Sequence, residues 1–306
     1  RDLFSPFKEF EVNRDDFDVE YSDHSPKGAT AQVHKGINKK TGEIVAVKEL
    51  SNYAKQGEIE LTFLRTEIGN LTRLKHVYIA DFIGFSLTDK DNSVCFIFKY
   101  YEDGLLSDYI HRTGAKKLSG DDMTRIAFKI AKVMTFIHSK HILHHDLKPN
   151  NIMMNGMDPK IIDFGYSGFD NVALNNDFCV GTYNYMAPEI LRSEKYNAKS
   201  DVFSFAMILY EMWSQELPFG DLDGDEITDL VLNNFRLDFK AKPIQMALKK
   251  LIENCWDDDQ NVRPSFKDIM ARMINETVMF PGADEVNMKK FYEEESKKIS
   301  ELIFKI

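Results

Sequence analysis

The chain contains little cysteine and no apolar run long enough to span a bilayer. It has three cysteines, an odd number, which lie far apart in the sequence at Cys95, Cys179 and Cys255. They therefore predict reduced thiols in an intracellular, cytoplasmic setting rather than a framework of disulfides. The apolar run at 202–213 has 12 residues and is interrupted by polar ones, so it is too short for a transmembrane helix. With no recognisable signal peptide either, no membrane partner is expected.

The chain also has fewer basic than acidic residues. Lysine and arginine total 39 and aspartate and glutamate total 49, which gives the 306-residue chain a net charge of −10. An acidic surface disfavours nucleic acid as a partner and favours basic peptides as substrates. The chain starts at Arg1 rather than at methionine, which predicts that further domains flank this segment.

Two short motifs carry the chemistry. The stretch 144–151 reads HHDLKPNN and the stretch 163–165 reads DFG, so that two carboxylates and one carboxamide come from Asp146, Asp163 and Asn151. Phosphoryl transfer needs metal ions that bridge phosphate oxygens and a carboxylate beside the attacking hydroxyl. We expect Asn151 and Asp163 to bind Mg²⁺, which prefers hard oxygen ligands, and Asp146 to orient the hydroxyl.

A lysine and a glutamate upstream fit the same chemistry. Lys48 ends the β-branched run 44–48, which is typical of a buried strand. Glu67 lies within the apolar stripe of a helix that runs from about Ile59 to Leu74. Each has a plainer interpretation, as a strand-end lysine and as a solvated surface glutamate. A carboxylate on the apolar face of its helix favours the other interpretation, an ion pair that positions ATP phosphates.

From 16 to 275 the chain resembles the eukaryotic protein kinase family. Beyond the motifs above, the similarity rests on GTYNYMAPE at 181–189, the apolar run that Asp201 opens, Cys255-Trp256 and Arg263-Pro264. The last two pairs resemble the tyrosine-kinase-like branch, whose members are mostly serine/threonine enzymes. Kinases of small molecules generally lack the Ala-Pro-Glu and Arg-Pro elements, which makes them a distant second choice.

The resemblance implies several residue roles. Lys148 and Thr182 match serine/threonine kinases, in which these positions line the site around the attacking hydroxyl, and Arg263 should pair with Glu189. ATP and Mg²⁺ are the implied cofactors and a protein is the implied substrate. The residues expected to bind the nucleotide are Pro26, Gly28, Ala31, Val33, Ala46, Lys48, Phe98, Lys99, Tyr100 and Met153.

The implied fold is the α+β, bilobal protein kinase fold. We expect an N-terminal extension at 1–15, whose Phe4, Phe7 and Phe10 are spaced to pack on the small lobe. The small lobe, an antiparallel sheet with one main helix, should occupy 16–98, and the hinge 99–104. A larger, mostly helical lobe should occupy 105–275, with a long helix at about 123–137. The helical extension at 276–306 either caps the large lobe or leads into a further domain.

Two departures from the family pattern bear on activity. The loop that covers phosphate keeps only the middle glycine, Gly28, and has Pro26 and Ala31 in place of the others, which predicts weaker ATP binding. His145 replaces the arginine that usually binds an activating phosphate. The stretch 168–181 contains no serine, threonine or tyrosine. We therefore expect an active serine/threonine kinase that does not need phosphorylation of its activation segment.

Three features of the sequence have a second interpretation. The altered loop also fits a pseudokinase that binds nucleotide or partners without transferring phosphate. Four histidines at 138–145 resemble a metal cluster but lack a zinc-ligand pattern, and His144 is expected to pack beneath the catalytic loop instead. The aspartates at 221, 223 and 225 do not complete a calcium loop.

Overall fold

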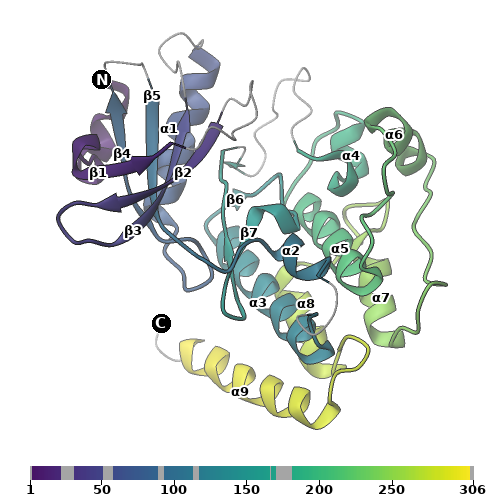
Figure 1. Ribbon diagram of the computed structural model, residues 1–306. Coiled ribbons are helices and arrows are strands. Elements are labelled where there is room, and N and C mark those ends of the chain that lie inside the picture. The colour runs from purple at the N-terminus through teal and green to yellow at the C-terminus, as the bar shows by residue number, and fades with distance from the viewer. Residues whose placement is uncertain are drawn as a thin grey trace. The chain divides into compact units, whose positions relative to one another are not determined.

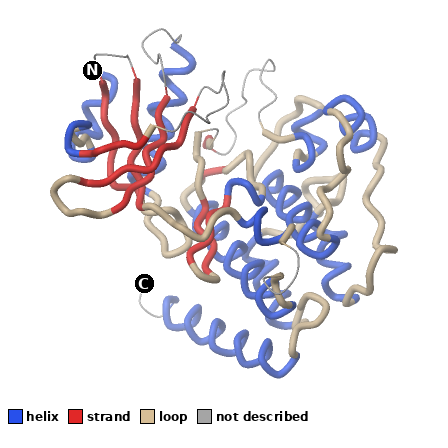
Figure 2. The backbone as a smooth tube through the Cα atoms, in the orientation of Figure 1, coloured by secondary structure: helices blue, strands red, loops and turns tan. Residues whose placement is uncertain are grey.

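The computed structural model describes residues 2–21, 31–50, 58–88, 93–112, 117–165, 167–169 and 181–303. The chain divides into two compact units. The first comprises Arg1–Glu102 with Ile162–Ser167, and the second comprises Asp103–Ile161 with Gly168–Ile306. Strands dominate the first unit and helices the second (Figures 1 and 2). The predicted α+β class, with a small antiparallel-sheet unit and a larger helical unit, is confirmed.

The first unit is built on a five-stranded antiparallel sheet. Its strands, in spatial order, are β1 (Phe17–Glu20), β2 (Ala31–Asn38), β3 (Ile44–Leu50), β5 (Ser93–Lys99) and β4 (Phe82–Thr88). Side chains alternate between the two faces of a strand. Val45 and Val47 of β3 are buried in a cluster with Ile97, so Ala46 and Lys48 project from the opposite face.

One helix and the N-terminal segment complete this unit. Helix α1 (Glu58–Arg73) is the predicted helix, and it buries Leu64, Ile68 and Leu71. The N-terminal residues form the 3₁₀ helices η1 (Asp2–Phe10) and η2 (Arg14–Asp16). The expected packing of the N-terminal phenylalanines is confirmed, since the Phe4 ring lies 6.2 Å from that of Phe85.

The second unit is organised around two long helices. Helix α3 (Gly120–Ser139) is the predicted long helix, and it starts at a capping box in which Ser119 and Asp122 bond each other's backbone N–H. Helix α5 (Lys199–Ser214) is buried along 200–214. Around them lie α2 (Leu106–Ile110), α4 (Pro188–Leu191), α6 (Gly224–Leu232), α7 (Met246–Cys255), α8 (Phe266–Asn275) and α9 (Glu285–Ile303).

Short strands and turns of the second unit hold the predicted catalytic residues. Strands β7 (Ile152–Asn155) and β8 (Asp158–Ile161) form a hairpin, and β6 (Ile142–Leu143) pairs with β9 (Gly168–Phe169). The 3₁₀ helix η5 (Pro149–Asn151) leads into β7, and η6 (Tyr183–Tyr185) precedes α4. The loop 144–148, which carries Asp146, therefore connects β6 to η5.

The C-terminal helix packs on the second unit. Helix α9 lies beside α3 and α8 (Figure 1). The buried Phe291 and Tyr292 each place a ring 5.5 Å from that of Phe128, and Lys132 pairs with Glu295 at 2.6 Å. Of the two roles expected for this extension, capping is the one observed.

The two units differ from the expected division at three places and agree with it at a fourth. The segment 162–167 belongs to the first unit, not to 105–275, and its Asp163 pairs with Lys48 of that unit. Residues 1–15 and 276–306 are parts of the two units rather than separate extensions, and the first boundary, after Glu102, falls inside the expected hinge at 99–104. Among the residues that the structure describes, no helix has the length and apolar character needed to cross a membrane.

Candidate active site

In the first unit, three predicted residues meet at the Lys48 ammonium group. Its Nζ donates to Glu67 Oε1 at 2.9 Å and to Asp163 Oδ1 at 2.8 Å. Strand β3, helix α1 and the segment 162–167 supply one residue each. The ion pair between Lys48 and Glu67 is thus observed, and the solvated-glutamate interpretation is wrong because Glu67 is only 4% exposed.

The Lys48 cation lies between two carboxylates that repel each other, and it stabilises both. Burial by itself would lower the pKa of Lys48, but the adjacent carboxylates of Glu67 and Asp163 outweigh it and raise the pKa above its usual value. Burial raises the pKa of Glu67, and the Lys48 cation opposes that rise. Lys48 is therefore a cation at neutral pH, and Asp163, whose side chain is 34% exposed, is the more open carboxylate.

The backbone of Asp163 is in the left-handed region, with φ at 63°. For a residue other than glycine this conformation costs about 1–3 kcal/mol, and such residues cluster at functional sites. The hydrogen bond from Lys48 Nζ to the Asp163 carboxylate helps to hold the residue in this conformation. The backbone at Gly165 lies close to both carboxylates of the triad. A Cβ there would lie 3.3 Å from Asp163 Oδ1 and 3.5 Å from Glu67 Oε2.

One face of the sheet gathers several residues predicted to bind nucleotide. Directly opposed residues of an antiparallel pair share a face, and Val33 opposes Lys48 while Ala46 opposes Phe98. Val33 is 66% exposed, which leaves an apolar surface next to Lys48. The Tyr100 ring lies beneath the Lys35 ammonium group at 5.1 Å.

Lys99 and Met153 are predicted nucleotide residues that are not part of this face. Pro26 and Gly28 fall outside the described residues, and Ala31 is the first residue of β2. Lys99 opposes Val45 and so lies on the other face of the sheet from Ala46. Met153 belongs to β7 in the second unit, where it forms a backbone bridge with Leu105.

In the second unit, the predicted catalytic carboxylate is buried and fully engaged. Asp146 is 7% exposed. Its Oδ2 lies 2.8 Å from Asn151 Nδ2 and 2.7 Å from Lys148 Nζ. Its Oδ1 accepts from Thr182 Oγ1 at 3.1 Å, and Lys148 Nζ also donates to Thr182 at 2.5 Å. Four residues from two separate stretches of sequence are thus joined in one network.

Asp201 anchors the loop that carries Asp146, a role that sequence reasoning missed. Its carboxylate accepts the backbone N–H of His144 at 2.9 Å and of His145 at 3.0 Å, and it lies 2.8 Å from His138 Nε2. Burial opposes ionisation of Asp201, but the bond to His138 and the nearby histidines lower its pKa. The available signal was a carboxylate at the start of an otherwise apolar helix.

Histidines 144 and 145 have different surroundings. His144 is fully buried, as expected for a residue that packs beneath the loop, and its Nδ1 accepts from the backbone N–H of Asp146 at 3.3 Å. The His145 ring packs edge-on against Tyr196, with centroids 5.1 Å apart, and its backbone has a φ of 67°. Burial lowers the pKa of His145, so its imidazole is neutral at pH 7.

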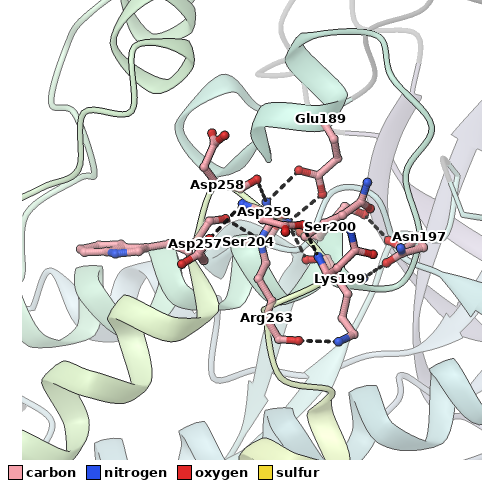
Figure 3. Close-up of polar contacts among 12 residues, drawn as sticks. Glu189, Asn197, Lys199, Ser200, Ser204, Asp257, Asp258, Asp259 and Arg263 are labelled. Atoms are coloured by element: carbon pink, nitrogen blue, oxygen red, sulfur yellow. Dashed lines mark hydrogen bonds and ion pairs between the residues drawn. The ribbon is translucent and has the colours of Figure 1, made fainter.

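The implied ion pair between Glu189 and Arg263 is confirmed (Figure 3). The guanidinium binds the carboxylate through two parallel bonds, of 2.7 Å and 2.8 Å, and is completely buried. It also donates to the backbone oxygens of Asp257 and Lys199, and the Lys199 ammonium group donates to the backbone oxygen of Arg263. This network joins helix α4 and the start of α5 to the loop before α8.

Comparison with known proteins agrees with this geometry. Residues 26–274 match the family model described as protein kinase domain. The chain is 34% identical over 264 residues to the serine/threonine-protein kinase VIK of Arabidopsis thaliana, which covers 82% of this chain and 59% of that protein. It is 30% identical over 247 residues to the serine/threonine/tyrosine-protein kinase HT1 of the same plant, covering 80% and 63%. The chain thus spans about three fifths of the length of these two relatives.

Proposed function

This chain belongs to the protein kinase domain family, and we propose that it is an ATP-dependent protein serine/threonine kinase. The proposed reaction transfers the γ-phosphoryl group of ATP to a protein hydroxyl. The observation that supports it most is the pair of polar networks described above, one around Lys48 and one around Asp146. A scaffold that only binds partners has no chemical need for both.

The residues fit the cofactors of the family, which are ATP and Mg²⁺ as a rule. Asn151 and Asp163 are oxygen donors of the kind that Mg²⁺ prefers. Asn151 donates from Nδ2 to the backbone and side chain of Asp146, which leaves its amide oxygen as an acceptor for a metal. Held by Asn151 and Asp163, Mg²⁺ would neutralise the negative charge of the phosphates.

We assign the other groups as follows. Lys48, kept cationic by its two carboxylate partners, binds phosphate oxygens, and Glu67 fixes its position. Asp146 accepts the proton of the attacking hydroxyl and orients it. Lys148 and Thr182, both bonded to Asp146, line the place of that hydroxyl, as in serine/threonine kinases.

The adenine is proposed to bind against the sheet face that carries Val33, Ala46 and Phe98. Met153 would contact the base, and the backbone at Lys99 and Tyr100 would bond its edge. Pro26 and Ala31 replace glycines of the loop that covers phosphate, so the proposed consequence is a reduced affinity for ATP rather than its loss.

A phosphoryl-transfer assay tests the proposed function. The chain is incubated with labelled ATP, Mg²⁺ and a generic basic protein, beside Asp163→Asn. We expect label on serine and threonine of the substrate with the unchanged chain, and background with the variant, because an amide binds Mg²⁺ more weakly than a carboxylate. Equal incorporation by both forms, or none by either, would favour the scaffold.

Activation without phosphorylation of the activation segment is also proposed. The stretch 168–181 has no hydroxyl side chain to modify. His145, at the position of the usual phosphate-binding arginine, is packed against Tyr196 and has a lowered pKa because it is buried, so it offers no cation to a phosphate.

Phosphatase treatment checks this second proposal. Purified protein should keep its kcat after treatment, measured beside a mock-treated sample. Mass spectrometry before and after treatment locates every phosphate removed. A loss of activity that accompanies loss of a phosphate from residues 163–189 would contradict the proposal.

We also propose basic protein substrates, an intracellular setting and additional domains. The excess of acidic over basic residues, 49 against 39, supports basic protein substrates. The low cysteine count supports an intracellular setting, and the relatives' greater length supports additional domains.

A further inference from the structure

The N-terminal segment, residues 2–12, runs along the edge of the sheet in the first unit. Strand β4 is an edge strand. Glu11 pairs with Phe85 of β4 in a parallel bridge, and the backbone N–H of Val12 donates to the Phe85 oxygen at 2.8 Å. A Cβ at Gly84 would lie 2.5 Å from the Phe10 oxygen. The segment thus covers backbone that an edge strand otherwise exposes.

The three phenylalanines of this segment have different partners. The rings of Phe4 and Phe10 pack on rings of β4, at 6.2 Å from Phe85 and 6.4 Å from Phe82. Phe7 instead reaches α1, where its Cζ lies 3.4 Å from the place that a Cβ of Gly69 would occupy. Phe7 therefore joins the segment to the helix carrying Glu67.

Phe7 contacts α1 on the side away from Glu67. Residues of a helix are separated by roughly 100° about its axis, so Gly69 lies about 200° from Glu67. The helix is held on one side by the bond from Glu67 to Lys48 and on the other by the Phe7 ring. Glycine inside a helix lowers its intrinsic stability, which makes α1 more dependent on such contacts.

We propose that Phe7 is a positioning residue, which holds α1 so that Glu67 stays paired with Lys48. This inference rests on the proposed kinase function for its effect on catalysis. Without the ring, α1 samples positions in which the pair is open, and the fraction of molecules ready to bind phosphates correctly falls. A nucleotide that binds both states equally does not restore the closed pair, so kcat falls by the same factor as the closed fraction.

Hydrogen exchange and steady-state kinetics of the full chain test the proposal together. In Phe7→Ala we expect backbone amides of 58–73 to exchange about tenfold faster than in the unchanged chain, and kcat to fall about tenfold. Phe7→Met, which keeps an apolar side chain of similar reach, should restore most of both values.

Phe10→Ala is the matched control, because its ring packs on Phe82 of β4. In this variant, amide exchange in 58–73 and kcat should stay within about twofold of the unchanged chain. Its thermal midpoint should fall as much as that of Phe7→Ala. Equal exchange in 58–73 for the two alanine variants would overturn the proposal. Faster exchange in Phe7→Ala with an unchanged kcat would overturn it as well. If the unchanged chain transfers no phosphate, the proposed function fails, and exchange alone decides whether Phe7 holds α1.

Discussion

Replacing Asp146 with asparagine is expected to lower kcat by about 10²- to 10⁴-fold, the usual contribution of a positioned acid or base. Asparagine keeps the shape of the side chain and an oxygen for Thr182, while its NH2 group takes the place of the oxygen that accepts from Asn151 and Lys148. It cannot accept a proton from the attacking hydroxyl. Because Lys48 and Asp163 are unchanged, the KM for ATP should stay within about threefold. Steady-state kinetics with varied ATP separate the two effects.

Asp158→Asn is a suitable control for this variant. Asp158 is also an aspartate of the second unit that bonds a lysine, Lys129, at 2.6 Å, but its side chain is 44% exposed. We expect its kcat to remain within about twofold, since exposed ion pairs contribute little. If Asp146→Asn kept kcat within tenfold and raised the KM for ATP instead, Asp146 would not act on the hydroxyl.

Arg263→Met is expected to destabilise the second unit by about 3–5 kcal/mol, the usual effect of removing one partner of a buried ion pair. The change leaves the Glu189 carboxylate buried without its two bonds from the guanidinium. Both tryptophans of the chain, Trp213 and Trp256, belong to the second unit and are buried. Urea unfolding followed by tryptophan fluorescence therefore reports on the unit that the variant perturbs.

The control here is Arg272→Met. Arg272 pairs with Glu276 one helical turn away, at 3.4 Å, and both side chains are partly exposed, so less than about 1 kcal/mol should be lost. A double variant, Arg263→Met with Glu189→Leu, should recover part of the loss, since it removes the unpaired charge. A loss below 1 kcal/mol for Arg263→Met alone would show that the pair does not stabilise the unit.

The sequence predicted the parts of the site that depend on local pattern. The apolar stripe of α1 placed Glu67 on the buried face, and the β-branched run of β3 placed Lys48 on a strand, which is why the pair could be predicted. The pair of Glu189 and Arg263 followed from the family resemblance, because 74 residues separate its members and no periodicity connects them.

Contacts set by the packing of distant segments could not be predicted. The sequence showed Asp201 only as the residue that opens an apolar run, whereas its oxygens hold the loop before Asp146. The phenylalanine spacing predicted that the N-terminal segment packs on the first unit, but only the coordinates show that Phe7 meets Gly69. The segment 162–167 likewise belongs to the first unit through contacts with distant residues, among them the bond between Lys48 and Asp163, 115 positions apart.

A crystal structure of the chain with Mg²⁺ and a non-hydrolysable ATP analogue tests the central proposal most directly. We expect carboxylate and amide oxygens of Asp163 and Asn151 about 2.0–2.1 Å from Mg²⁺, and Lys48 Nζ within about 3.2 Å of a phosphate oxygen. Glu67 should remain bonded to that lysine, and Asp146 should face the terminal phosphate. A nucleotide-bound structure in which any of these five side chains points away from the triphosphate would contradict the proposal.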